Sequence, residues 1–551
     1  QGQLFTKAEA GAGRARAMSA AGNDAVATFT AEEVSQHCRE GDLWMIIDGG
    51  VYDLSKFGAV HPGGIPPLVD PTVAGKDATE LFYGLHRASV LQEKRYARLK
   101  IGVLAGAAEA KKGKKKASDL GLATVPYGEA MGTWRKFSPY YKESHHRLRA
   151  AVREFLETEI KPYCKDWDDN GELPSKEVDL KLGKAGIFAT LVAGEEGTAE
   201  LFKQHGITLP GGISVEEWDY FHSLVMTEEI RRGVNGCYGV SDGLIGGMSI
   251  GLPPLLKFGS KEIIEQFAVP CIKGEKRICL AISEPYAGSD VAQIRTTAFP
   301  AKDGSWHVSG VKKWITGGMV ADYFTTLVRT EKHGPCMLLV ERGDGSTLST
   351  KPIKTSYSLA AATAYVSIHK NVVPPENLIG KPGIGFQQTM ANFNFERWGM
   401  IVCGNRHSRM VVEECMKWAF QRKVFGKTLI QQPVIRYKMA EMAASVESVH
   451  SMLEDLTYQM TNMNPSEINK HLAGPIALLK YKQTRVATLV ADNACQIFGG
   501  RAITSSGMGF IVEKFQKSFK FQAILGGSEE IMADFAMRQA MRGAEDMPAR
   551  L

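Results

Sequence analysis

The order in which sequence patterns follow one another constrains the fold of this chain most strongly. Helical patterns of apolar residues run from about residue 131 to 278, and long helical patterns return from residue 385 to the end. Between them lie short segments rich in β-branched and aromatic residues, such as "YFTTLVRT" (323–330) and "AYVSIHKNVVP" (364–374). We therefore expect a helical domain (131–279), a β domain (280–384) and a second helical domain (385–545).

A smaller unit precedes these domains. Residues 27–105 form a Gly-punctuated segment in which "DLWMIIDGGVYDL" predicts two strands around a tight turn. The composition then changes, and five of the six positions 111–116 are lysine. This pattern predicts a solvated linker over 106–130, with a nuclear signal or an anionic docking surface as the alternative. The whole chain is predicted to be a multidomain α+β protein.

Composition excludes several classes of protein. The net charge of the 551 residues is only +6, so nothing in the overall charge indicates nucleic acid. The nine cysteines show no CxxC or CxxCH spacing, which argues against structural zinc and covalently attached haem and fits a reducing compartment. No apolar run is long enough to predict a membrane span.

The two ends are predicted to lie outside the folded domains. Residues 1–17 have no periodic pattern and precede Met18, so we expect a tag remnant within a disordered segment, 1–26. The tail 546–551 ends in Ala549-Arg550-Leu551, which resembles a relaxed form of the Ser-Lys-Leu peroxisomal signal. The predicted localisation is peroxisomal, and otherwise mitochondrial or cytoplasmic.

Two histidines in the first unit predict a haem centre. "HPGG" (61–64) is followed 25 residues later by His86 in "GKDATELFYGLHR" (75–87). Haem iron needs two neutral imidazoles from opposite sides of its ring, and separated loops can supply them. With the preceding hairpin, these motifs resemble a cytochrome b5 domain over 27–105. The resemblance implies that His61 and His86 are the axial ligands of a non-covalent haem b. In "IPP" (65–67) the chain departs from the family, because two prolines should shorten or kink the helix that usually follows.

Four segments in the large part of the chain carry a second resemblance. They are "CLAISEPYAGSDVAQIRT" (279–296), "KKWITGG" (312–318), "QRKVFGKTLIQQP" (421–433) and "QIFGGRAIT" (496–504). In this order they resemble the acyl-CoA dehydrogenase family over 131–545. The family fold is a helical domain, a β domain and a four-helix bundle, the order expected above. The resemblance implies FAD between the β domain and the bundle, an acyl-CoA substrate, and a homodimer or homotetramer.

The resemblance also implies roles for individual residues. Ser289 lies beside the bound acyl-CoA, and the chain departs from frequent family residues at Leu280, Val424 and Pro433. The implied FAD contacts are Leu280, Ile282, Ser283, Trp314, Ile315 and Thr316 at the flavin ring, Arg422, Phe425, Gln496, Gly499 and Gly500 from across a subunit boundary, and also Ser528 and Glu530.

The catalytic base is not where many family members carry it. The glutamate that usually precedes the last long helix falls on Gly526 in "AILGGSEEIMADF" (523–535). Ser528 and Glu529 in this stretch suit a helix start, as N-cap and first-turn residue. The absence of a carboxylate at 526 leaves a backbone N–H there, which the resemblance assigns to the thioester oxygen.

Glu396 is the alternative base. It stands in "ANFNFERWGM" (391–400), directly before Arg397, where isovaleryl-CoA and long-chain acyl-CoA dehydrogenases place their glutamate. On a helix, Phe393 and Met400 flank it, and no Lys or Arg lies within a helical turn on its face. An unpaired carboxylate in an apolar setting is costly unless it is used or paired at long range. We therefore predict Glu396 as the base, with Phe393 and Arg397 beside the substrate; the alternative is a tertiary ion pair.

The sequence is compatible with several electron acceptors for the reduced flavin. A two-electron flavin and a one-electron haem in one chain suggest that reduced FAD passes electrons to the haem, while an acceptor protein or O2 would be alternatives. Other relatives of the fold oxidise nitroalkanes or bind DNA. The first would need an Asp near Gly526, and the second a more basic bundle. A non-catalytic electron carrier is a further alternative, against which Glu396 argues.

Overall fold

The computed structural model describes residues 27–87, 90–91, 93–106, 123, 125–134 and 137–544. The chain divides into two compact units, residues 1–115 and 116–551. The predicted N-terminal segment (1–26), the lysine run (111–116) and the C-terminal tripeptide all lie outside the described residues.

The first unit is built on a five-stranded sheet in the order β1-β5-β4-β3-β2. The predicted hairpin is present, because β3 and β4 pair in antiparallel register and Ile47 faces Gly50 across a two-residue turn. Asp48 and Gly49 both have positive φ, as such a tight turn requires. The elements are β1 (Thr28–Phe29), α1 (Ala31–Ser35), β2 (Cys38–Arg39), β3 (Asp42–Ile47), β4 (Gly50–Asp53), α2 (Thr79–Tyr83), α3 (Lys94–Ala97) and β5 (Lys100–Leu104).

The segment after the first histidine contains no helix. Residues 61–78 run through turns, as the two prolines after HPGG predict. Pro66 and Pro67 lack the N–H groups that a helix would use, so only the turn bonds from Leu68 and Val69 to the Ile65 carbonyl form there.

The second unit begins with a helical domain. Its central helices are α6 (Glu143–Glu159), which ends just before Pro162 as predicted, and α10 (Tyr220–Gly233). The remaining helices are α5 (Met131–Trp134), α7 (Cys164–Asn170), α8 (Lys176–Lys184), α9 (Thr198–His205), α11 (Tyr238–Ser241), α12 (Gly247–Gly251), α13 (Pro253–Phe258), α14 (Lys261–Ile263) and α15 (Val269–Ile272).

The β domain follows, with its own apolar core. Its main strand order is β10-β9-β7-β8-β12-β11, and β6 pairs with β9 in parallel. The strands are β6 (Ile278–Ala281), β7 (Thr297–Pro300), β8 (Trp306–Ile315), β9 (Tyr323–Thr330), β10 (Gly334–Glu341), β11 (Leu348–Pro352) and β12 (Ala364–Val373).

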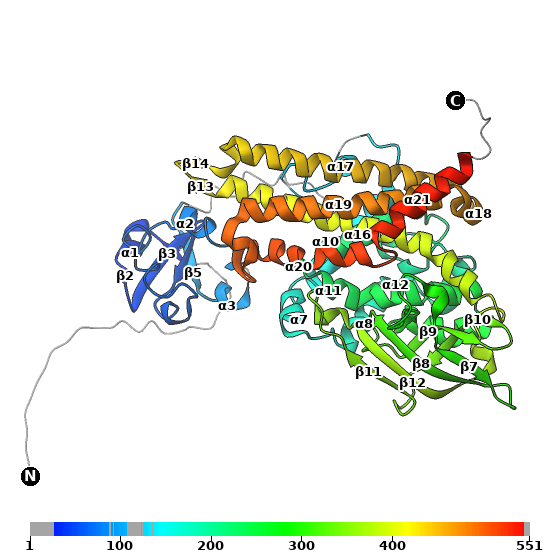
Figure 1. The fold of residues 1–551 in the computed structure, drawn as a ribbon. Helices are drawn as coiled ribbons and strands as arrows, with labels where there is room; N and C mark the ends of the chain where they lie inside the picture. The colour runs from blue at the N-terminus through cyan, green and yellow to red at the C-terminus, as the bar shows by residue number, and fades with distance from the viewer. Residues whose placement is uncertain are drawn as a thin grey trace, which may run out of the picture. The chain divides into compact units, whose positions relative to one another are not determined.

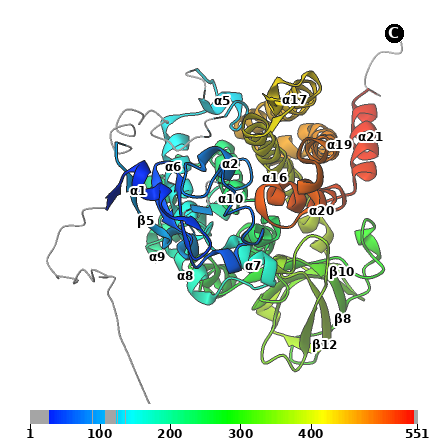
Figure 2. The same ribbon diagram turned by 90° about the vertical axis from the view of Figure 1, so that its left-hand side faces the viewer.

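Long helices complete the second unit. Helices α16, α17, α19 and α20 lie side by side, as Figure 1 shows along their length and Figure 2 nearly end-on. They share one core with the preceding helical domain. The elements are α16 (Gly385–Gln421), β13 (Lys423–Val424), β14 (Lys427–Thr428), α17 (Pro433–Asn462), α18 (Pro465–Glu467), α19 (Ala473–Phe498), α20 (Phe510–Ile524) and α21 (Glu529–Ala544). The predicted succession of helical, β and helical domains is confirmed. Among the described helices, none combines the length and the apolar character needed to cross a bilayer.

Candidate functional site

Glu396 lies half-buried on α16, and its carboxylate is weakly paired. The amide of Asn392, one turn earlier, donates to Oε1 at 2.8 Å. Burial raises the pKa of Glu396 to about 7, although the Asn392 hydrogen bond and the Arg397 charge act in the opposite direction. A carboxylate with a pKa near neutrality can accept a proton from a weak carbon acid and is still ionised in part at physiological pH.

The structure brings Gly526 next to the part of α16 that carries Glu396. Gly526 has φ +65°, and a Cβ built there would lie 2.6 Å from Sδ of Met400, which follows Glu396 by one turn. The Nε of Arg397 donates to the Gly526 carbonyl at 3.4 Å, and the Arg397 guanidinium lies 5.5 Å from the Phe393 ring. No hydrogen bond from the Gly526 N–H is found among the described residues. Residues far apart in the sequence thus form one cluster with a free N–H donor.

Replacing Gly526 with alanine should both strain the backbone and disturb the site. Positive φ costs a non-glycine residue about 1–2 kcal/mol, and the new methyl group would also displace the Met400 side chain. We expect a Tm about 1–2 °C lower and a turnover at least about tenfold slower, measured by acyl-CoA-dependent flavin bleaching.

Gly334→Ala is the matched control for this substitution. Gly334 has φ +77° in the β9–β10 turn, and a Cβ added there would have no atom within 4 Å. The variant should lose stability to a similar degree without losing turnover. Equal turnover of Gly526→Ala and Gly334→Ala would contradict a role for the 526 turn.

The predicted flavin-ring residues gather at one end of the β domain. The Lys313 N–H donates to the Ser283 carbonyl at 2.8 Å, which joins the first two sequence motifs. A β-bulge in the pairing of β8 with β12 covers Lys313 and Trp314, and Trp314 has φ +66°. This conformation leaves the Trp314 side chain 49% exposed, while Ile315 and Thr316 are buried. Strained backbone that presents a large aromatic surface is typical of ligand sites.

A buried ion pair holds the loop that carries Ser289. Lys312 Nζ donates to Glu284 at 2.9 Å and to the Ile282 carbonyl at 3.0 Å. Glu284 also accepts from the backbone N–H groups of Arg295 and Thr296. This pair, which the sequence did not predict, closes the loop around residues 284–296 and leaves Ser289 exposed at its tip.

The other predicted cofactor residues lie at an end of the bundle. Arg422 follows α16, and Gln496, Gly499 and Gly500 are exposed at the end of α19. Phe425 is 95% exposed with φ +50° on the β13–β14 hairpin. Arg501, also missed from sequence, joins this group. Burial and the nearby Arg422 lower the pKa of Arg501, and among the described residues neither guanidinium has an ion pair. Two uncompensated cations beside exposed glycines suit a phosphate-containing ligand.

The two histidines of the first unit face each other. The ring centres of His61 and His86 are 6.1 Å apart. Two metal–nitrogen bonds of about 2 Å each, with half an imidazole on either side, would fit this separation. Each Nδ1 donates to a backbone carbonyl, His61 to Gly64 at 2.9 Å and His86 to Phe82 at 3.1 Å, so both Nε2 atoms are free as ligands. Burial lowers the pKa of His86 and favours its neutral, ligating form.

The surroundings of this pair also fit haem. A Cβ on Gly63 would lie 3.0 Å from Cε1 of His61, so a side chain there would push the ring aside. Three apolar side chains near the histidines are exposed by about half or more, Val60, Leu81 and Leu85. Such a cluster is unusual on a small soluble domain and matches the apolar face of a porphyrin.

Family models match four segments of the chain. Residues 142–275, 279–372 and 383–541 match the N-terminal, middle and C-terminal domains of acyl-CoA dehydrogenase. The chain belongs to the acyl-CoA dehydrogenase family. Residues 30–105 match the cytochrome b5-like heme/steroid binding domain, so both resemblances noted in the sequence are confirmed.

Individual relatives agree with this acyl-CoA dehydrogenase assignment. Acyl-CoA dehydrogenase apdG of Emericella nidulans is 36% identical over 425 residues, which cover 76% of this chain and 96% of the relative. The mitochondrial short-chain specific acyl-CoA dehydrogenase of Sus scrofa is 30% identical, over 71% of this chain and 88% of its own length. The solved structure of a probable acyl-CoA dehydrogenase from Mycobacterium abscessus superposes with a TM-score of 0.62 at 25% identity, covering 72% and 99% of the two chains.

The FAD of an acyl-CoA dehydrogenase would need both groups of predicted cofactor residues. One group lies in the β domain, and the other lies at the end of the bundle near β13 and β14. Figure 1 shows these two regions at opposite sides of the second unit.

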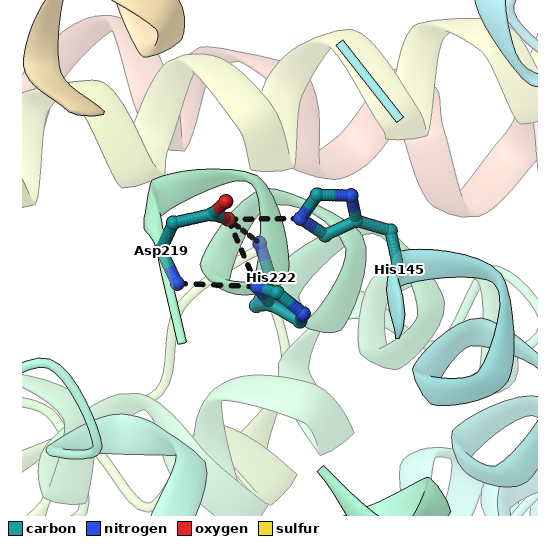
Figure 3. A group of neighbouring side chains, drawn as sticks. All are labelled: His145, Asp219 and His222. Carbon is teal, nitrogen blue, oxygen red and sulfur yellow. Dashed lines mark hydrogen bonds and ion pairs between the residues drawn. The ribbon is translucent and has the colours of Figure 1, made fainter. Parts of the chain in front are cut away.

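A further cluster of His145, Asp219 and His222, drawn in Figure 3, is better explained by helix capping than by a metal. Nδ1 of His145 accepts the Lys142 N–H at 2.8 Å, so its Nε2 carries the proton and donates to Asp219 at 2.9 Å. Nδ1 of His222 likewise accepts the Asp219 N–H at 3.1 Å, and its Nε2 lies 3.1 Å from Ser144 Oγ. A cation would have to break these bonds, which tie together the starts of α6 and α10.

Replacing Glu529 with glutamine should leave turnover within a few-fold. Glu529 accepts from Thr484 at 2.9 Å and Arg485 at 3.3 Å, and Lys520 lies 3.5 Å away. These partners and its place at the start of α21 account for its charge without catalysis. We expect a stability loss of about 1 kcal/mol in urea unfolding. A turnover loss comparable to that of the Glu396 substitution would contradict this assignment.

Proposed function

We propose that the protein dehydrogenates an acyl-CoA thioester to the trans-2-enoyl-CoA, with Glu396 as the base. Glu396 takes the α-proton while the Gly526 N–H binds the thioester oxygen, which gains negative charge in the transition state. Bound FAD supplies the acceptor, flavin N5, for the hydride that leaves the β-carbon. The observation that carries the proposal is a carboxylate with a pKa of about 7 on the same helix as Arg397 and Met400, the two residues that lie against Gly526.

A screen of acyl-CoA thioesters tests the proposal. The FAD-loaded protein is mixed anaerobically with saturated thioesters of different length and branching, and the flavin absorption is followed. Bleaching by at least one thioester is expected, with the matching enoyl-CoA found by mass spectrometry. Nitroethane is the control substrate for the nitroalkane-oxidising alternative, and bleaching by nitroethane alone would overturn the proposal.

The active unit in this proposal is at least a dimer. Arg422, Phe425 and the Gly499–Gly500 turn of one copy complete the FAD site of the other. The 95% exposure of Phe425 in the single chain supports this arrangement, because a large aromatic side chain at the tip of a hairpin suits an interface.

The haem is the proposed electron acceptor. His61 and His86 would hold haem b, which can take one electron at a time. The support is the presence of both domains in one chain and the free Nε2 atoms of the two histidines. After anaerobic addition of acyl-CoA, the absorption of reduced haem should appear once the flavin has bleached. If the haem stays oxidised, O2 or another protein is the acceptor, and hydrogen peroxide formed in air identifies the oxidase alternative.

A further inference from the structure

Lys480 is a buried cation beside the turn that carries Gly526. It lies on α19 and is 1% exposed. Its Nζ donates to the Leu525 carbonyl at 2.6 Å and also to the Gly527 carbonyl. In the part of the chain that the structure describes, no carboxylate forms an ion pair with it, and Glu529 bonds to Thr484 and Arg485 instead. Glu529 favours the charged form of Lys480 only from beyond ion-pair distance. An ammonium group buried without an ion-pair partner is costly, so it calls for a function.

The Leu525 carbonyl and the Gly526 N–H belong to the same peptide group. In a trans peptide they point in opposite directions, so a cation bonded to the oxygen lies behind the N–H. Consecutive hydrogen bonds polarise one another, by roughly 10–30% per bond. The bond from Lys480 to the Leu525 carbonyl therefore makes the Gly526 N–H a stronger donor.

Arg397 is a second cation that contacts the 525–527 turn. Arg397 donates to the Gly526 carbonyl, so the peptide groups on both sides of Gly526 are each bonded to a positive charge. Burial, together with the Arg397 charge, lowers the pKa of Lys480 to about 7. Negative charge developing on a ligand at the Gly526 N–H would stabilise the charged form of Lys480. Such an interaction is stronger in the transition state than in the ground state.

We propose that Lys480 is a positioning residue for the dehydrogenation, which holds the 525–527 turn and polarises the peptide whose N–H binds the thioester oxygen. It acts through Leu525 and Gly527 and does not touch the substrate. The inference rests on the proposed function, since it assigns a purpose to the Gly526 N–H in that reaction.

Infrared spectroscopy of a bound product tests this inference. The FAD-loaded protein is mixed with trans-2-enoyl-CoA that carries ¹³C at the thioester carbonyl, and the carbonyl stretch is compared with that of the free thioester. We expect a lower wavenumber in the complex. In Lys480→Met the stretch should move back towards its free value, and kcat should fall by about 10- to 100-fold with a smaller change in KM. Lys482→Met is the matched control, because Lys482 is exposed two residues further along α19, and it should change neither quantity.

A second variant, Lys480→Gln, keeps the inference testable if Lys480→Met does not fold. Lys480→Gln is smaller and neutral, and it should move the carbonyl stretch in the same direction. An unshifted carbonyl band in the unmodified protein would overturn the inference without any variant. A Lys480 variant that binds FAD and keeps both the shifted band and kcat would also overturn it. Failure of the proposed function looks different, because then no acyl-CoA bleaches the flavin of the unmodified protein.

Discussion

Glu396→Gln is expected to abolish flavin reduction by acyl-CoA, with bleaching slower by up to about 10⁴-fold. Glutamine has nearly the same shape, and its Oε1 can keep the hydrogen bond from Asn392. The substitution therefore removes the proton acceptor and leaves the packing of α16 in place. Stopped-flow absorbance measures the bleaching, and the visible spectrum shows whether FAD is still bound.

The pH dependence should identify the same group. Glu396 must be ionised to accept a proton, so kcat/KM should rise with pH through about 7 and level off above it. The raised pKa also affects folding. The folded state binds a proton more tightly than the unfolded chain between about pH 4.5 and 7, so stability falls as the pH rises through this window. At pH 8 the glutamine variant should be more stable, by on the order of 3 kcal/mol.

Glu529→Gln is the matched control for Glu396→Gln, and it should show neither the loss of bleaching nor the gain in stability. Its pKa is lowered in the folded state, by hydrogen bonds and nearby cations that outweigh burial, so its removal acts on stability in the opposite direction. Bleaching that persists in the Glu396 variant with FAD bound would exclude Glu396 as the base.

His61→Ala is expected to prevent stable haem binding. His61 and His86 face each other across 6.1 Å, so either histidine alone leaves one side of the iron without a protein ligand. Loss of an outer-shell partner already weakens metal sites by about 10–100-fold, so we expect at least about 100-fold weaker haem binding. Titration of the full chain with haem, followed at the main haem absorption band, measures the affinity. Flavin bleaching by acyl-CoA should be unchanged.

His37→Gln provides the control for this substitution. His37 is in the same domain, where it bonds to Asp42 and stacks on Trp44, and among the described contacts it meets neither His61 nor His86. Its haem affinity should equal that of the unmodified protein. If His61→Ala keeps the six-coordinate spectrum of the original protein, another side chain is the ligand and the assignment fails.

Much of the fold could be predicted because it depends on local patterns. The hairpin of β3 and β4 follows from a strand pattern around Asp48 and Gly49, and the end of α6 follows from Pro162. The haem ligands and the flavin loops were predicted from short motifs, since close approach to a cofactor demands particular residues at particular spacings. Glu396 could be selected because its own helical turn offers no positive partner on its face.

Residues that act through distant partners could not be predicted in this way. Lys312 pairs with Glu284, 28 positions earlier, and Lys480 bonds to the turn at 525–527. One sign was available for Lys480, because positions 476, 477, 483 and 484 around it on α19 contain no carboxylate. This pattern indicates a lysine without a carboxylate partner on its own helix, but it does not predict which residues the lysine contacts.

The sequence by itself therefore determined the order of the domains, the two families and the residues that stand in their motifs. Those features depend on patterns within one element or one loop. Only the tertiary structure decided that Gly526 lies against Met400 and Arg397, that Lys480 supports the turn between them, and that the two groups of predicted FAD residues lie apart in one chain. The physical reason is that burial and long-range contacts arise only when helices pack, and these set the pKa of Glu396 and the hydrogen bonds of the 525–527 turn.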